Sequence, residues 1–220
     1  EAFASLFFYI TNLFLVLFPM TKKFLHVGCG QAKKENTTQV LKEDTWDEVR
    51  LDIDPSVNPD IIGDILDLNN IDDNSYDAVF SSHNIEHVFM HEVKIALSEF
   101  KRVLKEDGFL LLCCPDISVA CEMIASGKVG EKLYDSPAGP IFPLELLYGH
   151  NTSIAAGKTY MAHKTGFTID TLKFFIGDAG FKSYIIAEDN IFNLWALAYK
   201  NKTFEDDVLT NELKLHFGLN

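Results

Sequence analysis

Short apolar runs alternate with stretches of helical spacing along most of this chain, from Lys23 to Lys200. The runs that predict β-strands are residues 23–28, 48–54, 76–82, 108–115, 182–187 and 193–200. Residues 91–108 and 169–181 carry apolar side chains three and four positions apart and end near a glycine, which is typical of helices packed against a sheet. The alternation predicts an α/β fold, Rossmann-like and doubly wound, around a mostly parallel sheet.

An insertion interrupts this alternation between Ser118 and His163. A helix is predicted near residues 119–126, and the prolines and glycines of YDSPAGPIFP are expected to exclude regular structure for several residues after it. The strand before the insertion ends at the carboxyl edge of the sheet, where loops commonly carry function. We therefore expect residues 118–163 to form a lid or a wall of the substrate site.

An uncharged apolar run extends from Ala2 to Met20 and is followed by Lys22 and Lys23. Its length allows a membrane anchor. Pro19 ends the run, and it lacks the basic start and small-residue cleavage site of a signal peptide. We favour the alternative that residues 1–19 are upstream or added sequence before a start at Met20. The predicted organisation is this extension (1–19), one domain (20–200) and a peripheral polar tail (201–220).

Composition narrows the class of partner. The chain has 220 residues, of which 47% are hydrophobic, enough to bury one full core. Its net charge of −13 argues against nucleic acids and anionic membranes, which proteins bind mainly through Lys and Arg, and favours a small-molecule partner. The four cysteines show no CxxC spacing, so reduced thiols and a cytoplasmic location are expected.

A glycine loop follows the first predicted strand, in the segment LHVGCGQAKK. Gly28 and Gly30 would let the backbone approach a ligand closely, next to a helix N-terminus. The dinucleotide fingerprint needs a third glycine where Lys33 stands, and the Walker sequence is also absent. Asp52 ends the second predicted strand, where a carboxylate can accept hydrogen bonds from a ribose diol. The loop and the acid together predict a cofactor that contains a ribose.

Five segments resemble, in order, those of class I S-adenosylmethionine-dependent methyltransferases, particularly the small-molecule group called type 11. They are FLHVGCG, VRLDIDPSVNPDIIGDILDL, YDAVFSSHNIEHV, EFKRVLKEDGFLLLCCPD and GFTIDTLKFFIGDAGF. The resemblance covers roughly residues 23–200. It implies a seven-stranded sheet whose last strand is antiparallel, an insertion after the fifth strand, and S-adenosylmethionine as the cofactor.

The resemblance also implies which residues contact the cofactor. They are Gly28, Cys29 and Gly30 under its methionine part, Asp52 at its ribose, Asp64 and Ile65 at its adenine, Ser81 and Ser82 where it meets the substrate, and Ile53, which follows Asp52. Two departures stand out: His26 replaces an acid that often supports the methionine amino group, and Gln31-Ala32 replaces the third-glycine region. Each residue alone also has a structural explanation, such as a turn or a helix cap, but their joint occurrence favours the methyltransferase.

The segment HNIEHVFMH spaces three histidines four positions apart, which would align His83, His87 and His91 on one face of a helix beside Glu86. The HExxH order of zinc enzymes is absent. Similar methyltransferases carry a comparable glutamate-histidine pair without a metal. We therefore expect no metal site, and we expect His87 to be structural.

Methyl transfer mainly requires a nucleophile aligned with the S–CH₃ bond, and a hydroxyl or amine acceptor also benefits from a base near neutral pKa. His83, at a strand end, and His163, where the insertion rejoins the domain, are the candidate bases, although His163 also fits a structural role. His150 is a weaker candidate. Tyr148 and Tyr160 are candidates to shape the acceptor site or to belong to the core.

The expected function is transfer of a methyl group from S-adenosylmethionine to an oxygen or nitrogen of a small molecule. Two alternatives remain open. One is another α/β enzyme with a nucleotide cofactor, which would need the missing glycine fingerprint. The other is a domain that binds S-adenosylmethionine without catalysis.

Overall fold

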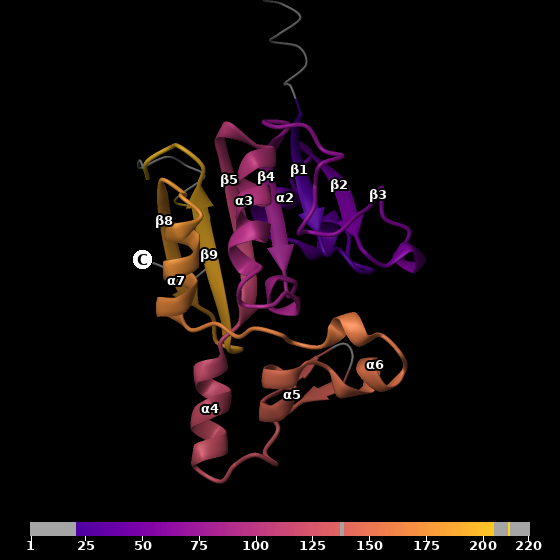
Figure 1. Ribbon diagram of the computed structural model, residues 1–220, viewed down its shortest axis with the longest axis vertical. Helices are drawn as coiled ribbons and strands as arrows, with labels where there is room; N and C mark the ends of the chain where they lie inside the picture. The colour runs from indigo at the N-terminus through magenta and orange to yellow at the C-terminus, as the bar shows by residue number, and fades with distance from the viewer. Residues whose placement is uncertain (1–20, 137–138, 205–210, 212–220) are drawn as a thin grey trace, which may run out of the picture.

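The computed structural model describes residues 21–136, 139–204 and 211 (Figure 1). A seven-stranded sheet with the order β3-β2-β1-β4-β5-β9-β8 forms its centre. The strands are β1 (Lys22–Val27), β2 (Trp46–Asp52), β3 (Ile61–Ile62), β4 (Tyr76–Ser82), β5 (Leu104–Pro115), β8 (Ser183–Glu188) and β9 (Asn193–Tyr199). The two antiparallel pairs of this sheet, β5 with β9 and β8 with β9, both involve β9, and all its other pairs are parallel. The predicted fold class, including the antiparallel last strand, is confirmed.

Helices cover both faces of the sheet and extend beyond its end. The α-helices are α2 (Gln39–Lys42), α3 (Val93–Val103), α4 (Ile117–Ala125), α5 (Pro143–Tyr148), α6 (Asn151–Ala155) and α7 (Ile169–Asp178). Four 3₁₀ turns are η1 (Lys34–Asn36), η2 (Pro55–Val57), η3 (Ile85–His87) and η4 (Thr159–Met161). None of the helices among the described residues has the length and apolar character needed to cross a bilayer. Residues 1–19 and most of the predicted tail at 201–220 lie outside the described residues.

The strands divide their side chains between two cores because successive strand residues point to opposite faces. Leu25 of β1 belongs to the core shared with α3 and α7, whereas Phe24 belongs to the core shared with α2. In the same way Leu110 of β5 faces one core and Leu111 the other. Both faces are therefore buried, which explains the nearly continuous apolar run of β5.

Two predicted boundaries near the insertion are wrong. Strand β5 begins at Leu104 rather than Gly108, because Leu104 pairs with Tyr76 before an irregularity in the register between β4 and β5. The run predicted to lack regular structure contains a hairpin of β6 (Tyr134–Ser136) and β7 (Gly139–Ile141). Pro140 is compatible with this hairpin because a two-stranded ribbon leaves edge positions whose N–H groups need no partner.

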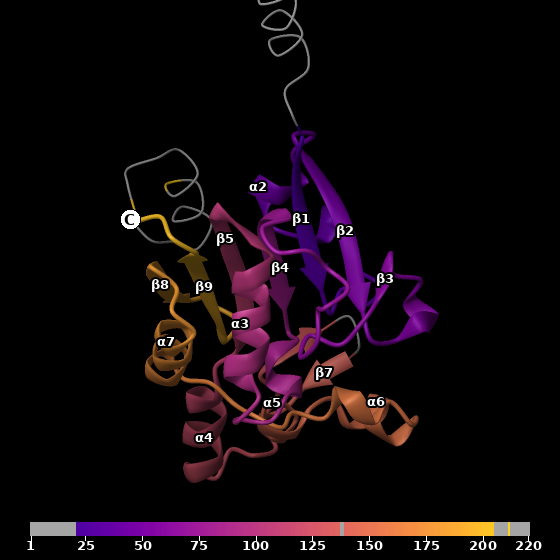
Figure 2. The ribbon, with the colours of Figure 1, turned by 45° about the horizontal axis from the view of Figure 1, so that its top comes forward.

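The insertion lies beyond the carboxyl ends of the parallel strands. Figures 1 and 2 show α4, α5 and α6 gathered there, past the arrowheads of β1, β2 and β4. The chain leaves and rejoins the domain at neighbouring points, because the backbone N–H of Ile117 donates to the carbonyl of Phe167 at 3.0 Å. The insertion therefore lies at the edge where open α/β sheets bind ligands, and its role as a lid or wall of a substrate site stays a prediction.

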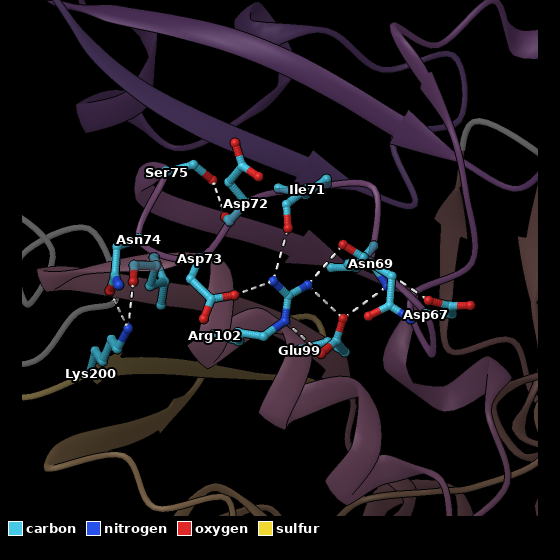
Figure 3. A network of polar contacts seen from close by, with 12 residues as sticks. Asp67, Asn69, Ile71, Asp72, Asp73, Asn74, Ser75, Glu99, Arg102 and Lys200 are labelled. Atoms are coloured by element: carbon cyan, nitrogen blue, oxygen red, sulfur yellow. Dashed lines mark hydrogen bonds and ion pairs between the residues drawn. The ribbon is translucent and has the colours of Figure 1, made fainter.

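An arginine on α3 holds the loop between β3 and β4 (Figure 3). Arg102 forms two hydrogen bonds with the Glu99 carboxylate, both at 2.8 Å, and one with Asp73 at 2.6 Å. Its guanidinium also donates to the backbone carbonyls of Leu68 and Ile71, each at 2.8 Å. This network fixes the C-terminal part of a loop whose first residues line the cavity described below.

Candidate active site

The glycine loop at the end of β1 adopts a backbone that favours glycine. Gly28 and Gly30 have φ of 61° and 51°, in the left-handed region. A Cβ on Gly28 would lie 2.4 Å from Cγ of Asn84, so no side chain fits there. A Cβ on Gly30 would meet nothing within 4 Å. The loop thus packs tightly on one side and leaves Gly30 open on the other.

Asp52, the last residue of β2, connects the second strand to this loop. Its carboxylate accepts hydrogen bonds from the backbone N–H of Gly30 at 2.7 Å and from that of Asp54 at 2.9 Å. A carboxylate has about four acceptor positions, so about two remain after these bonds. Asp52 is 8% exposed and lines a cavity. Its geometry fits a ribose diol, because the remaining acceptors are held in place by the backbone.

This cavity, of about 500 Å³, opens where the strand order reverses between β1 and β4. Open α/β sheets bind ligands at this switch point, and the volume is typical of a small-molecule site. Six of the predicted cofactor residues line it: Gly28, Gly30, Asp52, Ile53, Asp64 and Ile65. Ile53 is 52% exposed, so it presents an apolar surface suited to a flat ring.

Three predicted cofactor residues lie elsewhere. Cys29 and Ser82 line an adjoining cavity of about 410 Å³. Burial raises the pKa of the Cys29 thiol to about 11, so the thiol is neutral. Ser81 is fully buried and lines neither cavity. His26, which stands in place of an acid, has its Nδ1 atom 2.7 Å from the Glu48 carboxylate and packs against Phe80.

His83 follows β4 and lines both cavities. Its φ is 50°, an uncommon value for a residue other than glycine and one found repeatedly at functional sites. Its side chain is 44% exposed toward this open space, although protein surrounds the rest of the ring. Desolvation lowers the pKa of His83, but the Cys113 and Glu86 side chains outweigh it and raise that pKa well above its ordinary value.

The segment after His83 contains only the 3₁₀ turn η3, so the three histidines do not share a helical face. His91 is exposed and stacks on Phe89, with ring centroids 5.9 Å apart. His87 instead lies against His163, with ring centroids 5.0 Å apart. The alignment considered for His83, His87 and His91 therefore does not occur, and the insertion supplies a different histidine.

Glu86 lies between these histidines. Its side chain is 1% exposed, with Oε1 3.6 Å from Nδ1 of His83 and 4.0 Å from Nε2 of His163. Burial raises the pKa of Glu86, but the histidines, His83 first among them, outweigh burial and hold that pKa at about 2. Burial lowers the pKa of His163, and Glu86 offsets this only in part. The cluster is thus an ionised, buried carboxylate beside a neutral imidazole.

The insertion contacts the cavity through η4 and the residues around it. The Tyr160 hydroxyl donates to Oδ2 of Asp54 at 2.6 Å, and the Lys158 ammonium lies 3.7 Å from the same oxygen. The Tyr160 hydrogen bond, followed by those of Ser56, lowers the pKa of Asp54 below its ordinary value. Lys158, Tyr160 and Met161 all line the cavity. A tyrosine of the insertion therefore closes onto the residues that follow β2.

Two of the sequence candidates lie away from this cavity. His150 pairs through Nδ1 with the Ser153 hydroxyl at 2.8 Å, and Tyr148 is 66% exposed. Both line a separate groove on the insertion. Sequence reasoning missed Asn84, which packs on Gly28, and it missed the buried position of Glu86. Their place directly after a predicted strand end was the available signal for both.

Comparisons with known proteins agree with this geometry. Residues 25–112 match the family model of a methyltransferase domain. No curated protein sequence matches the chain. Among solved structures, the chain is similar to an S-adenosylmethionine-dependent methyltransferase from Archaeoglobus fulgidus, with 15% identity, coverage of 89% of this chain and 93% of the other, and a TM-score of 0.55.

Two further solved structures show the range of the fold. One is the 1,6-didemethyltoxoflavin-N1-methyltransferase of Burkholderia thailandensis with bound 1,6-didemethyltoxoflavin and S-adenosylhomocysteine, at 12% identity, 87% and 76% coverage, and a TM-score of 0.54. The other is the CurJ carbon methyltransferase, at 12% identity, 84% and 50% coverage, and a TM-score of 0.50. The family match over residues 25–112, the strand order and the similarity to solved methyltransferases show the class I methyltransferase fold and support an S-adenosylmethionine-dependent methyltransferase, with S-adenosylmethionine as its cofactor.

Proposed function

We propose that this methyltransferase acts on an oxygen or nitrogen of a small-molecule acceptor, with His83 as the general base. The observation that carries the proposal is the position of His83, which lines the cavity at the end of β4 in a constrained backbone conformation. The insertion covers the same cavity through Tyr160 and Met161, which favours an acceptor small enough to be enclosed. The acceptor of the Burkholderia relative is likewise a small molecule, named as methylated at N1.

The cofactor contacts in this proposal follow the cavity lining. The backbone of Gly28 to Gly30 holds the methionine part, and Asp52 accepts hydrogen bonds from the ribose hydroxyls. Ile53 and Ile65 pack on the two sides of the adenine, and Asp64 accepts from its amino group. Cys29 contributes through its backbone, whose N–H donates to the Leu51 carbonyl at 3.2 Å.

Ser81 and Ser82 act in this proposal by forming the end of β4 rather than by direct contact. Ser81 pairs with Val27 across the sheet, so the two strands that flank the switch point stay in register. This register places Gly28 and His83, which follow directly, on the same edge. The two serines thereby help to set the separation between the cofactor loop and the base.

His83 serves the chemistry by taking the proton that the acceptor loses. The cofactor supplies a methyl group on a positively charged sulfur, which makes transfer favourable once the acceptor is aligned. A hydroxyl or an ammonium group must lose a proton, and a histidine at the cavity surface can receive it once its own ring is deprotonated. Because the pKa of His83 is raised, we expect kcat to rise as the pH increases toward that raised pKa. His163, whose side chain is only 12% exposed, acts in this proposal through Glu86 as a positioning residue.

The test is a methyl-transfer screen with the full chain, labelled S-adenosylmethionine and a library of small metabolites, followed by mass spectrometry of the product. We expect an O- or N-methylated small molecule, and His83→Asn should lower kcat by about 100-fold or more, the usual contribution of a general base. His91→Asn is the matched control, because His91 lies outside the cavity. A carbon-methylated product, or full turnover by His83→Asn, would refute the proposal.

A further inference from the structure

Glu86 is the least satisfied charged group in the described part of the chain. Its side chain is buried, yet neither carboxylate oxygen has a hydrogen-bond partner. The distances of 3.6 Å to His83 and 4.0 Å to His163 are too long for a hydrogen bond. A buried carboxylate is expected to accept hydrogen bonds as well as to face a charged group, so the two unbonded oxygens indicate a ligand that would sit between the side chains.

The histidines beside Glu86 offer acceptor atoms rather than donors. Nδ1 of His87 lies 3.1 Å from the Ala162 carbonyl oxygen, and Nδ1 of His163 lies 2.8 Å from that of Leu146. A carbonyl only accepts, so in each neutral ring Nδ1 carries the proton and Nε2 keeps a free lone pair. Backbone carbonyls commonly fix metal-binding histidines in this tautomer.

The three side chains lie close to one another. One ligand atom from each of Glu86, His87 and His163 lies within 4.8 Å of the other two. A tetrahedral ion with bonds of about 2.0–2.2 Å keeps neighbouring ligand atoms about 3.3–3.6 Å apart. The 4.0 Å between Nε2 of His163 and Oε1 of Glu86 would therefore shorten by only about half an ångström on binding.

We propose that Glu86, His87 and His163 bind a divalent transition-metal ion, with Zn²⁺ as the best match to the ligand set. Two imidazoles and one carboxylate are the ligands of catalytic zinc sites that keep a position open. Imidazole ligands also disfavour Mg²⁺, which prefers oxygen.

The location gives the ion a role in the reaction. His87 lines the main cavity together with His83, so the proposed ion would lie beside the space that His83 faces. An acceptor oxygen or nitrogen bound there would be held close to the base and to the end of β4. This role rests on the proposed function, whereas metal binding itself does not.

The test is a titration of the full chain, first treated with a chelator, by isothermal calorimetry without cofactor or acceptor. The wild type should bind one Zn²⁺ and should not bind Mg²⁺ comparably. Mutation of a residue that hydrogen-bonds a metal ligand, without binding the metal itself, typically lowers metal affinity by about 10–100-fold. Removal of a ligand itself, in Glu86→Gln or His163→Ala, should therefore lower the affinity for Zn²⁺ by more than about 100-fold. His91→Ala is the control and should bind as the wild type does.

Absorption spectroscopy with Co²⁺ supplies a second readout. A tetrahedral site of nitrogen and oxygen ligands should give visible bands without a thiolate charge-transfer band, whereas such a band would assign the ion to a cysteine and overturn the proposal. Absence of Zn²⁺ binding, or wild-type binding by both variants, would also overturn it. If Glu86→Gln does not fold, His163→Ala decides alone. Methyl transfer without Zn²⁺ binding would refute only the ion, and Zn²⁺ binding without O- or N-methylation would refute only the proposed function.

Discussion

Replacing Asp52 by asparagine tests the cofactor assignment most directly. The wild-type carboxylate holds the backbone N–H groups of Gly30 and Asp54 at 2.7 and 2.9 Å and keeps about two further acceptor positions for the ribose. An asparagine has the same shape but only one oxygen. Its NH₂ group would replace one oxygen, which faces both a backbone N–H and the ribose, so one hydrogen bond to a charged group is lost on each side.

The expected magnitude follows from these lost bonds. A hydrogen bond to a charged group contributes about 1.5–3 kcal/mol, so Asp52→Asn should weaken binding of S-adenosylmethionine by about 10-fold to 150-fold. The donor left facing Gly30 should also lower the free energy of unfolding by about 1–3 kcal/mol. Both effects have the same origin, because one side chain orders the loop and receives the ribose.

Calorimetry with S-adenosylhomocysteine and with an analogue that lacks one ribose hydroxyl separates the two effects. The wild type should bind the analogue more weakly than S-adenosylhomocysteine. Asp52→Asn should bind the two ligands with nearly equal affinity, because the variant has already lost the interaction with the ribose hydroxyl. Asp67→Asn is a suitable control, since Asp67 accepts a local bond from Asn69 at 3.2 Å and does not line the main cavity. Unchanged affinity in Asp52→Asn, or fully additive losses, would refute the assignment.

Three further predictions concern the supports of the site. Gly28→Ala should lower the free energy of unfolding by more than about 2 kcal/mol in a denaturant titration, because the new Cβ would lie 2.4 Å from Asn84. Gly30→Ala should lower it by only about 1–2 kcal/mol, since a Cβ there meets open space. Arg102→Met should lower the free energy of unfolding by about 2–3 kcal/mol in the same titration, because it removes hydrogen bonds to charged and backbone groups. A decrease under about 0.5 kcal/mol, which is typical of an exposed ion pair, would contradict this prediction. Tyr160→Phe should speed amide hydrogen exchange around η4 above about pH 4, because it removes the hydrogen bond to Asp54. This hydrogen bond lowers the pKa of Asp54. The protection in the wild type is therefore fully present above the ordinary carboxyl pKa and is lost as the pH falls toward the lowered pKa of Asp54.

The fold was predictable because its information is local. The apolar periods of β1, β4 and α3 are read within a few residues, and burial on one or both faces follows from them. The start of β5 was not predictable in this way. Residues 105–107 are charged and exposed, so their pattern resembles a helix end, and only pairing with β4 shows that they belong to a strand.

The candidate site likewise contains residues whose positions follow from local sequence patterns and residues whose positions do not. Gly28, Gly30 and Asp52 follow predicted strands directly, so their convergence follows from the sheet alone. The contact of Tyr160 with Asp54 depends on how the insertion folds back, and no periodic pattern encodes it. The same is true of His163 beside Glu86. Consequently the convergence of the glycine loop and Asp52 could be predicted from the sequence, whereas the contacts that the insertion makes with the cavity required the structure.

One short segment, residues 84–88, joins these two halves physically. On one side Asn84 packs against Gly28 in the cofactor loop. On the other, the Glu86 carbonyl accepts hydrogen bonds from the N–H groups of Lys164 and Thr165, at 2.8 and 3.2 Å, where the insertion returns to the domain. Any displacement of the returning insertion must therefore move Glu86, and with it the segment that supports the cofactor loop. Because the insertion and the loop share this support, acceptor binding under the insertion and cofactor binding at the loop should influence each other.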